Sequence, residues 1–358
     1  MSTLSPLPAE VSLSDQVQAK QKKTLVRRGA PDRSQGVRRA VQIAFLLLNA
    51  AIGVQFILWV RYFETGGTAN YFERPAGVDG WLPIAGLMNL RYFLALGKIP
   101  PIHPSAMVLL CVFLVASALV KKAFCSWLCP VGTVSEYLWK LGRKVFKRNL
   151  MMPKWLDVPL RGLKYLLLAF FVYIVFTMPA MDLGDFLASP FGIIADVKML
   201  NFFRYMGTVG MMVVLVLVTL SVVVQNFWCR FLCPYGALMG IVSALSPVKI
   251  RRDAEACPSQ LPVDRLVQIR SVECTGCMEC IAVCPAENAL QMALMPRKEA
   301  TGAARWRGRV MRPRMVAVVL AVVFFGLIGA ARVTGHWQTN LSREVYMQLV
   351  PNAENFDH

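Results

Sequence analysis

Five apolar stretches alternate with polar and basic segments along the chain, and they give the first picture of the fold. They lie near residues 40–60, 104–122, 160–179, 207–227 and 314–331. Each is long enough, or nearly so, to cross about 30 Å of hydrocarbon as an α-helix. The pattern predicts an α-helical integral membrane protein with about five transmembrane helices.

Two of these stretches end in the same motif, which indicates an internal repeat. The segment AFCSWLCPVGTVS at 123–135 matches FWCRFLCPYGALM at 227–239 in both cysteines, the proline and the glycine. We therefore expect two tandem repeats of two helices over 37–150 and 155–246, packed about an axis along the membrane normal. The first repeat should end in its CxxxCP motif and a basic amphipathic helix.

The rest of the chain divides into four smaller parts. Residues 1–36 are polar and basic without apolar periodicity, so we expect a disordered tail. A small ferredoxin-like segment is expected over 247–300, where cysteines gather. The last transmembrane helix is expected over 313–331 and is followed by a tail over 332–358.

The composition agrees with a membrane protein, with 56% hydrophobic and 17% charged residues and a mean hydropathy of +0.49. The net charge of +18 would suit nucleic-acid binding, but the basic residues flank apolar stretches and no nucleic-acid motif is present. We expect membrane lipid as a partner and no nucleic acid. The first apolar stretch starts near residue 40, after a long basic tail, so we expect a retained anchor and not a cleaved signal.

Lysine and arginine counts predict which side each segment faces. Three segments are rich in them, with eight, eight and thirteen: the chain up to 39, 121–158 and 229–314. Three are poor, with four, two and two: 61–103, 180–206 and the C-terminal tail from 332. Rich and poor segments alternate, as the positive-inside rule requires. We expect a bacterial inner-membrane protein whose N-terminus and cysteine motifs are cytoplasmic and whose C-terminus is periplasmic.

The ten cysteines are the candidate chemistry of the chain. Four of them form CTGCMECIAVCP, which has the spacing of a ferredoxin-type motif: Cys274, Cys277, Cys280 and Cys284. Three thiolates two residues apart can surround one corner of a [4Fe–4S] cubane, and Gly276 suits the tight turn that this needs. Zinc is an alternative, although zinc sites usually have paired CxxC knuckles.

In a two-cluster ferredoxin, the fourth cysteine of such a motif binds the other cluster. The first three cysteines then need another ligand. Cys257 is followed by proline and looks like the last member of a first motif whose three earlier cysteines are absent. We favour Cys257 as the fourth ligand beside Cys274, Cys277 and Cys280, and the alternative is closure by Cys284.

The two CxxxCP motifs predict a second cluster. Cysteines four residues apart lie on one face of a helix, and the proline that follows ends or kinks it. Both pairs together supply four ligands: Cys125, Cys129, Cys229 and Cys233. The alternatives are buried apolar cysteines, a copper or other soft-metal site, and disulfides, which a reducing cytoplasm disfavours. Cys111 lies within an apolar stretch and is expected to be a small packing residue.

These motifs carry a resemblance to a known family. Over about residues 40–345, the two CxxxCP motifs, CPSQLPVDRL and ECTGCMECIAVCPAENAL resemble the NapH-type membrane polyferredoxins, whose relatives include the membrane portion of NosR and the CcoG type. The resemblance implies [4Fe–4S] clusters and either electron transfer between the quinone pool and a partner oxidoreductase or maturation of a metalloenzyme. The chain departs from fuller members at the incomplete first ferredoxin motif, so we expect two clusters.

We therefore expect an electron-transfer subunit of the quinol dehydrogenase type, with two [4Fe–4S] clusters at the cytoplasmic face. Its expected partners are the quinone pool and a periplasmic ferredoxin or cytochrome, or a membrane oxidoreductase. Maturation of a copper enzyme and redox sensing are the alternatives. The chain has three histidines and no CxxCH motif, and His103 is expected to be a loop residue. The residues at which we would look for a quinone lie in the two external segments: Trp81, Arg91, Tyr92, Phe203 and Arg204.

Overall fold

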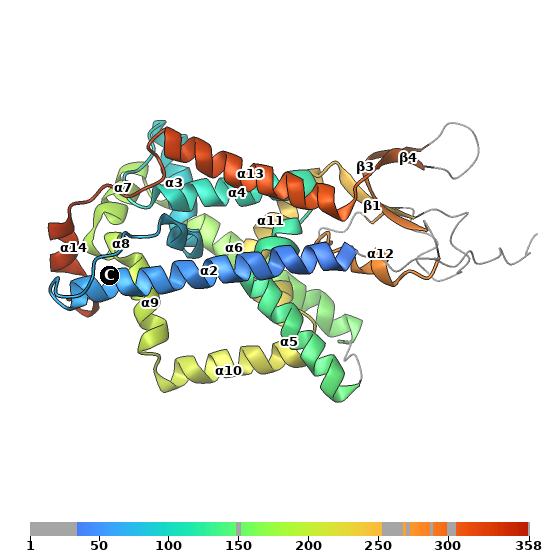
Figure 1. Ribbon diagram of the computed structural model, residues 1–358, viewed down its shortest axis with the longest axis horizontal. Coiled ribbons are helices and arrows are strands. Elements are labelled where there is room, and N and C mark those ends of the chain that lie inside the picture. Colours follow the sequence, from blue (N-terminus) through green and yellow to red (C-terminus); the bar gives the residue numbers. More distant parts are fainter. Residues whose placement is uncertain are drawn as a thin grey trace, which may run out of the picture.

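The computed structural model describes residues 34–147, 152–252, 268–269, 273–286, 289–298 and 306–356. Most of the tail expected over 1–36 lies outside the described residues, and so does Cys257. Within the described part, long helices run between two ends of the molecule (Figure 1). A small sheet lies at one end, and the C-terminal helix lies at the other.

Each of the five expected apolar stretches forms helix, but they differ in length. Three helices are long and apolar enough to cross a membrane: α2 Ser34–Glu64, α6 Lys154–Thr177 and α13 Pro313–Val333. Helices α9 (Ala195–Arg204) and α10 (Thr208–Val223) meet at 83° and pass the same test only as a pair. Helix α4 (Pro104–Val120) is apolar but shorter. The described residues thus give three crossing helices, or four with the bent pair, against about five expected.

Shorter elements connect these helices within the described residues. The α-helices are α3 Pro83–Leu96, α5 Pro130–Phe146, α7 Ala180–Ala188, α8 Pro190–Ile193, α11 Pro234–Val242, α12 Glu279–Val283 and α14 Arg343–Leu349. The 3-10 turns are η1 Ala76–Trp81, η4 Ser243–Leu245 and η6 Ala353–Asn355. Two single π-helical turns are η2 Phe124–Leu128 and η3 Trp228–Leu232.

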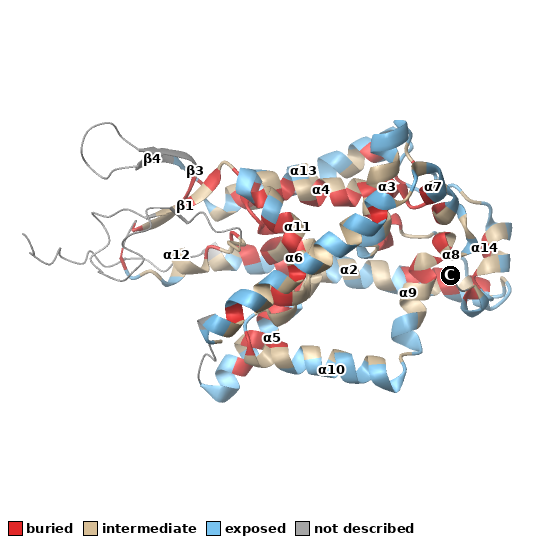
Figure 2. Ribbon diagram, turned by 180° about the vertical axis from the view of Figure 1, so that it is seen from behind, coloured by how far each residue is buried: buried red, intermediate tan, exposed pale blue. Residues whose placement is uncertain are grey.

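The two CxxxCP segments pack reciprocally. Each forms a π turn between an apolar helix and a shorter helix, in the order α4, η2, α5 and again α10, η3, α11. Helix α5 packs against α10, and α11 packs against α4. The helix after each motif therefore covers the helix before the other motif. Figure 2 shows the most buried residues where α4, α6 and α11 meet, whereas α10 is largely exposed.

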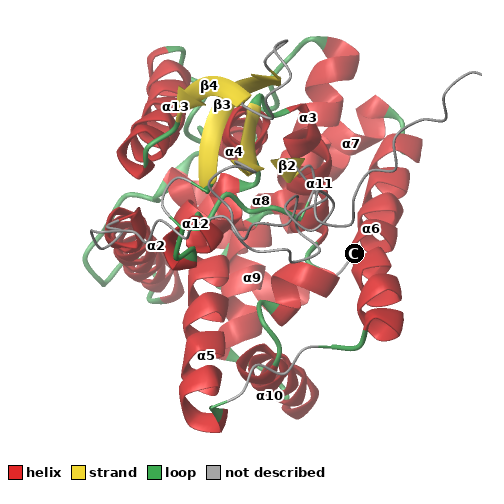
Figure 3. Cartoon of the chain, turned by 90° about the vertical axis from the view of Figure 1, so that its right-hand side faces the viewer, coloured by secondary structure: helices red, strands yellow, loops and turns green. Residues whose placement is uncertain are grey.

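The sheet has four antiparallel strands in the order β2, β1, β3, β4. Their bounds are β1 Val248–Arg252, β2 Gln268–Ile269, β3 Leu290–Lys298 and β4 Trp306–Val310. Val248 pairs with Leu294 in β3, and Ile250 lies between Met292 and Ile269. Figure 3, seen from this end, shows β3 and β4 close to α4 and α13. The sheet extends past the segment expected over 247–300, and the ferredoxin-type loop lies between β2 and β3 along the chain.

Two apolar clusters hold the ends together. At the sheet end, Trp127 of η2 packs in one cluster with Met292 of β3 and Val316 of α13. At the other end, Trp59 of α2 and Tyr346 of α14 pack edge to face, with ring centroids 5.0 Å apart. Fully burying one side chain of this size contributes about 1.5–3 kcal/mol. The tail expected over 332–358 is therefore anchored on α2.

Candidate metal centres

Both CxxxCP motifs have the same local structure, which is a π turn followed at once by an α-helix. The amide of the second cysteine donates to the carbonyl five residues earlier over 2.9 Å: Cys129 to Phe124 and Cys233 to Trp228. The proline that follows stands first in α5 or α11, where a missing N–H is tolerated. The regular helix expected for CxxxC is thus replaced by a wider turn, a feature found often at functional sites.

A glycine two residues after the proline permits each turn to close. A Cβ built on Gly132 would lie well under 3.0 Å from the Cys125 carbonyl oxygen. A Cβ built on Gly236 would lie 3.3 Å from the Cys229 carbonyl oxygen. In both motifs the carbonyl of the first cysteine therefore lies against the glycine. The fit is tighter in the first motif.

In the second motif, the second cysteine accepts a hydrogen bond from the start of the helix after it. The Gly236 amide donates to Cys233 Sγ over 3.2 Å, whereas Cys129, which caps α5 in the first motif, makes no such side-chain bond among the described residues. Hydrogen bonds to sulfur are one of the means by which proteins tune iron–sulfur clusters.

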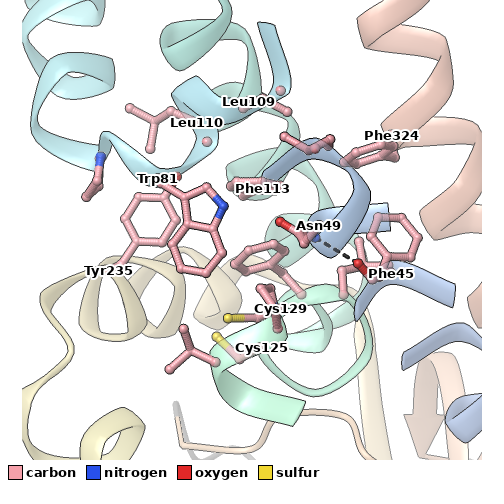
Figure 4. A pocket seen from close by; sticks show the side chains of 18 of the residues that line it. Phe45, Asn49, Trp81, Leu109, Leu110, Phe113, Cys125, Cys129, Tyr235 and Phe324 are labelled. Atoms are coloured by element: carbon pink, nitrogen blue, oxygen red, sulfur yellow. Dashed lines mark hydrogen bonds between the residues drawn. The ribbon is translucent and has the colours of Figure 1, made fainter. Parts of the chain in front are cut away.

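All four thiols of the two motifs line one cavity of about 1050 Å³. Figure 4 shows the Cys125 and Cys129 sulfurs side by side on its wall, with Tyr235 and Phe113 also lining it. Burial, with a smaller contribution from the neighbouring Cys129 and Cys233, raises the pKa of the Cys125 thiol to about 12. Burial and the three other thiols likewise raise the pKa of Cys229. The four thiols therefore share one buried, largely apolar environment.

This donor set fits an iron–sulfur cluster. In the described part of the chain, no three or more His, Cys, Asp and Glu side chains are grouped so as to hold a metal ion. A [4Fe–4S] cubane instead takes one cysteine at each of four irons. Four free thiols around a largely apolar cavity, with an amide donor on one of them, match that requirement. Ligation by these cysteines remains a prediction.

Of the ferredoxin-type cysteines, Cys274 and Cys277 lie in the loop before α12, and Cys280 lies in α12 itself. Gly276 has φ +64°, which the tight turn requires and which glycine adopts freely. Burial raises the pKa of Cys280 to about 12, and its neighbours Cys277 and Cys274 add to the shift. These three sulfurs therefore lie near one another, while Cys284 follows the end of α12. Cys257 lies outside the described residues, so its role as the fourth ligand stays a prediction.

The first CxxxCP turn is hydrogen-bonded to the ferredoxin-type loop. Ser126 Oγ donates to the Thr275 carbonyl over 2.7 Å, and Trp127 Nε1 donates to the Gly276 carbonyl over 3.2 Å. The two cysteine groups therefore face each other across Ser126 and Trp127. At the matching positions the second motif has Arg230 and Phe231, and Arg230 pairs with Asp157 over 2.7 Å. Sequence reasoning missed this contact, although the difference between the two repeats at these positions was visible.

A buried ion pair between α2 and α5 holds the first CxxxCP turn in place. Arg38 of α2 forms a two-bonded pair with Glu136 of α5, at 2.7 and 2.5 Å. Gln42 donates to the Ser126 carbonyl over 2.9 Å. Burial opposes ionisation of Glu136, but hydrogen bonds from Arg38 and Lys140 outweigh it and lower its pKa to about 2. The start of α2, η2 and α5 therefore form one unit.

Of the five residues considered for a quinone, Trp81 lines the cavity. The other four are not among its lining residues in the described chain. Arg91 lies over the Phe176 ring at 5.3 Å, and Arg204 pairs with Glu64 at 2.6 Å. The cavity runs from Trp81 of η1 to the cysteine pairs, and most of its wall is apolar.

His103 lies in a loop, as expected, but it is buried in a charged cluster. Its Nδ1 is 3.0 Å from Asp79 Oδ1 and its Nε2 is 3.0 Å from the Gly192 carbonyl. Arg74 joins Asp79 to Asp196, at 2.5 and 2.7 Å. Burial lowers the pKa of His103, but the charge of Asp79 and its hydrogen bond outweigh that effect, so the pKa is raised.

Comparison with known proteins agrees with this chemistry. A family described as a 4Fe–4S binding domain matches twice, over residues 102–149 and 206–253, and each match contains one CxxxCP motif. The fold and the cysteine motifs thus define a membrane protein of the iron–sulfur electron-transport class. The chain belongs to the family of NapH-type membrane polyferredoxins.

Three relatives show how far the similarity extends. YccM of Escherichia coli, described as a candidate electron transport protein, is 47% identical over 334 residues, covering 90% of this chain and 91% of YccM. The ferredoxin-type protein NapH of Haemophilus influenzae is 25% identical over 51% of this chain and 54% of NapH. The regulatory protein NosR of Pseudomonas aeruginosa is 28% identical over 47% of this chain and 24% of NosR. No solved structure matches the chain.

Proposed function

We propose that this protein passes single electrons between the quinone pool and a partner oxidoreductase through two [4Fe–4S] clusters. One cluster is held by both CxxxCP motifs, through Cys125, Cys129, Cys229 and Cys233. The other is held by Cys274, Cys277, Cys280 and Cys257, with Cys284 as the alternative fourth ligand. When bound, the clusters supply one-electron chemistry.

The observation that carries this proposal is the contact between the two cysteine groups. Ser126 and Trp127 lie between the cysteines of the first motif, and both donate to the backbone of the ferredoxin-type loop. Trp127 is 0% exposed, so water is excluded from this junction. A redox sensor or a metal-loading protein has no need to join two cluster sites in this way, whereas an electron carrier does.

The cavity supports the quinone end of the proposal. An isoprenoid quinol needs an apolar channel that reaches a cluster. The cavity has apolar walls from helices that would face the membrane interior, including Phe45, Leu109 and Phe113, and it ends at the cysteine pairs. A quinol that entered from the side of Trp81 would reach the CxxxCP cluster first, and the ferredoxin-type cluster would follow it.

Sidedness follows from the charge pattern. The start of α2 contacts both the first motif and the ferredoxin-type loop, as Gln35 shows by donating to the Cys277 carbonyl over 3.0 Å. Since the segments around these motifs are the ones rich in lysine and arginine, we place this end in the cytoplasm of a bacterial cell. The end with α14 then faces the periplasm.

The test is reduction of the clusters by quinol. The full chain is purified anaerobically, reconstituted in lipid vesicles with a short-chain quinol and frozen for electron paramagnetic resonance. The proposal predicts that quinol alone produces reduced-cluster signals. Clusters that dithionite reduces and quinol does not would refute the quinol role. If, in addition, deleting the gene removed copper from a partner enzyme, maturation would replace electron transfer as the conclusion.

A further inference from the structure

Three buried lysines gather beside the ferredoxin-type cysteines, and one of them has no partner. Lys122 and Lys164 pair with the Glu273 carboxylate at 3.4 and 2.6 Å. Lys121 is 0% exposed, and within the described residues its Nζ has no hydrogen-bond acceptor. A buried charge without a partner is costly, so such groups usually face an opposite charge or a ligand.

The backbone fixes Lys121 in this position. Its φ of 60° and ψ of −164° belong to a region that is almost confined to glycine. The Lys121 amide donates to Ser246 Oγ over 3.0 Å, and Ser246 Oγ donates to the Leu119 carbonyl over 3.0 Å. The end of α4 is thus hydrogen-bonded to Ser246, two residues before β1. Conformations of this kind are energetically costly and cluster at functional sites.

The backbone on both sides of Lys121 lies against the ferredoxin-type loop, since a Cβ built on Gly276 would lie 3.4 Å from the Val120 carbonyl oxygen and 3.8 Å from the Ala123 Cβ. Burial and the nearby Lys249 lower the pKa of Lys121, whereas a negative charge on Cys274 would raise it. Lys249 has no acceptor atom, and it donates its own hydrogen bond to the Ala244 carbonyl over 3.2 Å. The attracting group is therefore a cysteine of the ferredoxin-type motif. Lys122 is less specific for one cluster site, because its charge acts on Cys125 of the first CxxxCP motif as well as on Cys274 of the ferredoxin-type motif.

We propose that Lys121 is the fixed counter-charge of the cluster held by Cys274 and its neighbours, a positioning residue that favours the reduced state of that cluster. This inference rests on the proposed function, since it requires a cluster there. A four-thiolate [4Fe–4S] centre is an anion, and it gains one negative charge when it accepts one electron, with no bond made or broken. A desolvated ammonium stabilises the more negative state, and net charge is one determinant of cluster potentials.

The consequence is a direction for electron flow. If Lys121 raises the reduction potential of the ferredoxin-type cluster, an electron on the CxxxCP cluster moves toward it across Ser126 and Trp127. The unequal contacts of the two repeats agree with this, because the first motif is bonded to the loop while Arg230 of the second is bonded to Asp157. The ferredoxin-type loop would then be the exit toward the partner protein.

The test is a redox titration of both clusters, followed by electron paramagnetic resonance in the anaerobically purified full chain. Lys121→Met removes the charge and Lys121→Arg retains it. Lys144→Met is the matched control, because Lys144 is exposed on α5 and its loss changes net charge equally. We expect Lys121→Met to make reduction of the ferredoxin-type cluster about tenfold less favourable, which is about 59 mV for one electron. The Lys121→Arg and Lys144→Met variants should each change the equilibrium constant for reduction of that cluster by less than about threefold.

Each outcome decides the proposal. An unchanged potential in a fully loaded Lys121→Met variant overturns it. If that variant is isolated without the ferredoxin-type cluster, restored iron in Lys121→Arg supports the charge role, and absent iron in Lys121→Arg overturns it. A wild-type protein with no ferredoxin-type cluster overturns both this inference and the proposed function. If the wild type holds the ferredoxin-type cluster and the Lys121 variants have the same reduction potential as the wild type, the inference alone is overturned.

Discussion

The two glycines that follow the CxxxCP motifs offer a matched pair of perturbations. Gly132 and Gly236 hold the same place in the two repeats, but the space at each differs. A Cβ on Gly132 would lie well under 3.0 Å from the Cys125 carbonyl oxygen and 3.3 Å from its carbonyl carbon. These are backbone atoms of the turn itself, so they cannot swing away. A Cβ on Gly236 would lie 3.3 Å from the Cys229 carbonyl oxygen, so the neighbouring atoms would need to shift by only a few tenths of an ångström.

The expected magnitudes follow from these distances. Gly132→Ala overpacks the turn that presents Cys125 and Cys129, at about 1–3 kcal/mol. It should also displace both sulfurs, so the iron per chain should fall to about half of the wild-type value or less. Gly236→Ala should cost less than about 1 kcal/mol and keep nearly all of the iron. Gly162→Ala, with nothing within 4 Å of the added methyl, is the control.

The assay is iron and acid-labile sulfide per chain in the three anaerobically purified variants, with thermal unfolding in detergent as the stability readout. Equal iron in Gly132→Ala and Gly236→Ala would refute the reasoning, whichever level both reached. Such a result would mean that the first turn does not determine how its cysteines are held.

Three further predictions concern the contacts around the sites. Arg38→Met leaves the buried Glu136 carboxylate with only Lys140 and Gln42 as partners and should lower the free energy of unfolding by about 1.5–3 kcal/mol in denaturant titrations; a loss below about 1 kcal/mol would contradict the role of the pair. Trp127→Phe removes one hydrogen bond to the ferredoxin-type loop, worth about 0.5–1.5 kcal/mol, and freeze-quench resonance should show slower electron exchange at unchanged iron content; an unchanged rate would count against this junction. His103 has a raised pKa in the fold, so its bond to Asp79 contributes fully below the usual pKa of 6.5 and is lost as pH rises through the folded value. His103→Gln should therefore lower the melting temperature most at acidic pH, and an equal loss at all pH values would contradict this.

Cysteine spacing and hydropathy were enough to predict the class of the protein. The chain belongs to the expected family, and each apolar stretch became a helix because lipid-length apolar runs have few other ways to satisfy their backbone. The number of membrane crossings was less predictable. The 83° bend between α9 and α10 and the short length of α4 reduce the number of helices that are long enough to cross a membrane.

The contacts within the site could not be predicted from the sequence. A CxxxC spacing reads as a regular helix, whereas the following proline and the close approach of Gly132 to Cys125 favour a π turn. The positive-inside count treats Lys121 and Lys122 as loop charges, yet both are buried beside the ferredoxin-type loop. That burial depends on the sheet, which pairs β1 with strands far along the chain and gives no local signal before they pair.

The central claim is that this chain holds two clusters, one on the paired CxxxCP motifs and one on the ferredoxin-type loop. Iron and acid-labile sulfide per chain in the anaerobically purified wild type test it most directly. We predict about eight of each, since two [4Fe–4S] clusters require that number. About four of each in fully loaded protein would leave one cysteine group without a cluster, and electron transfer through Ser126 and Trp127 would have no second site.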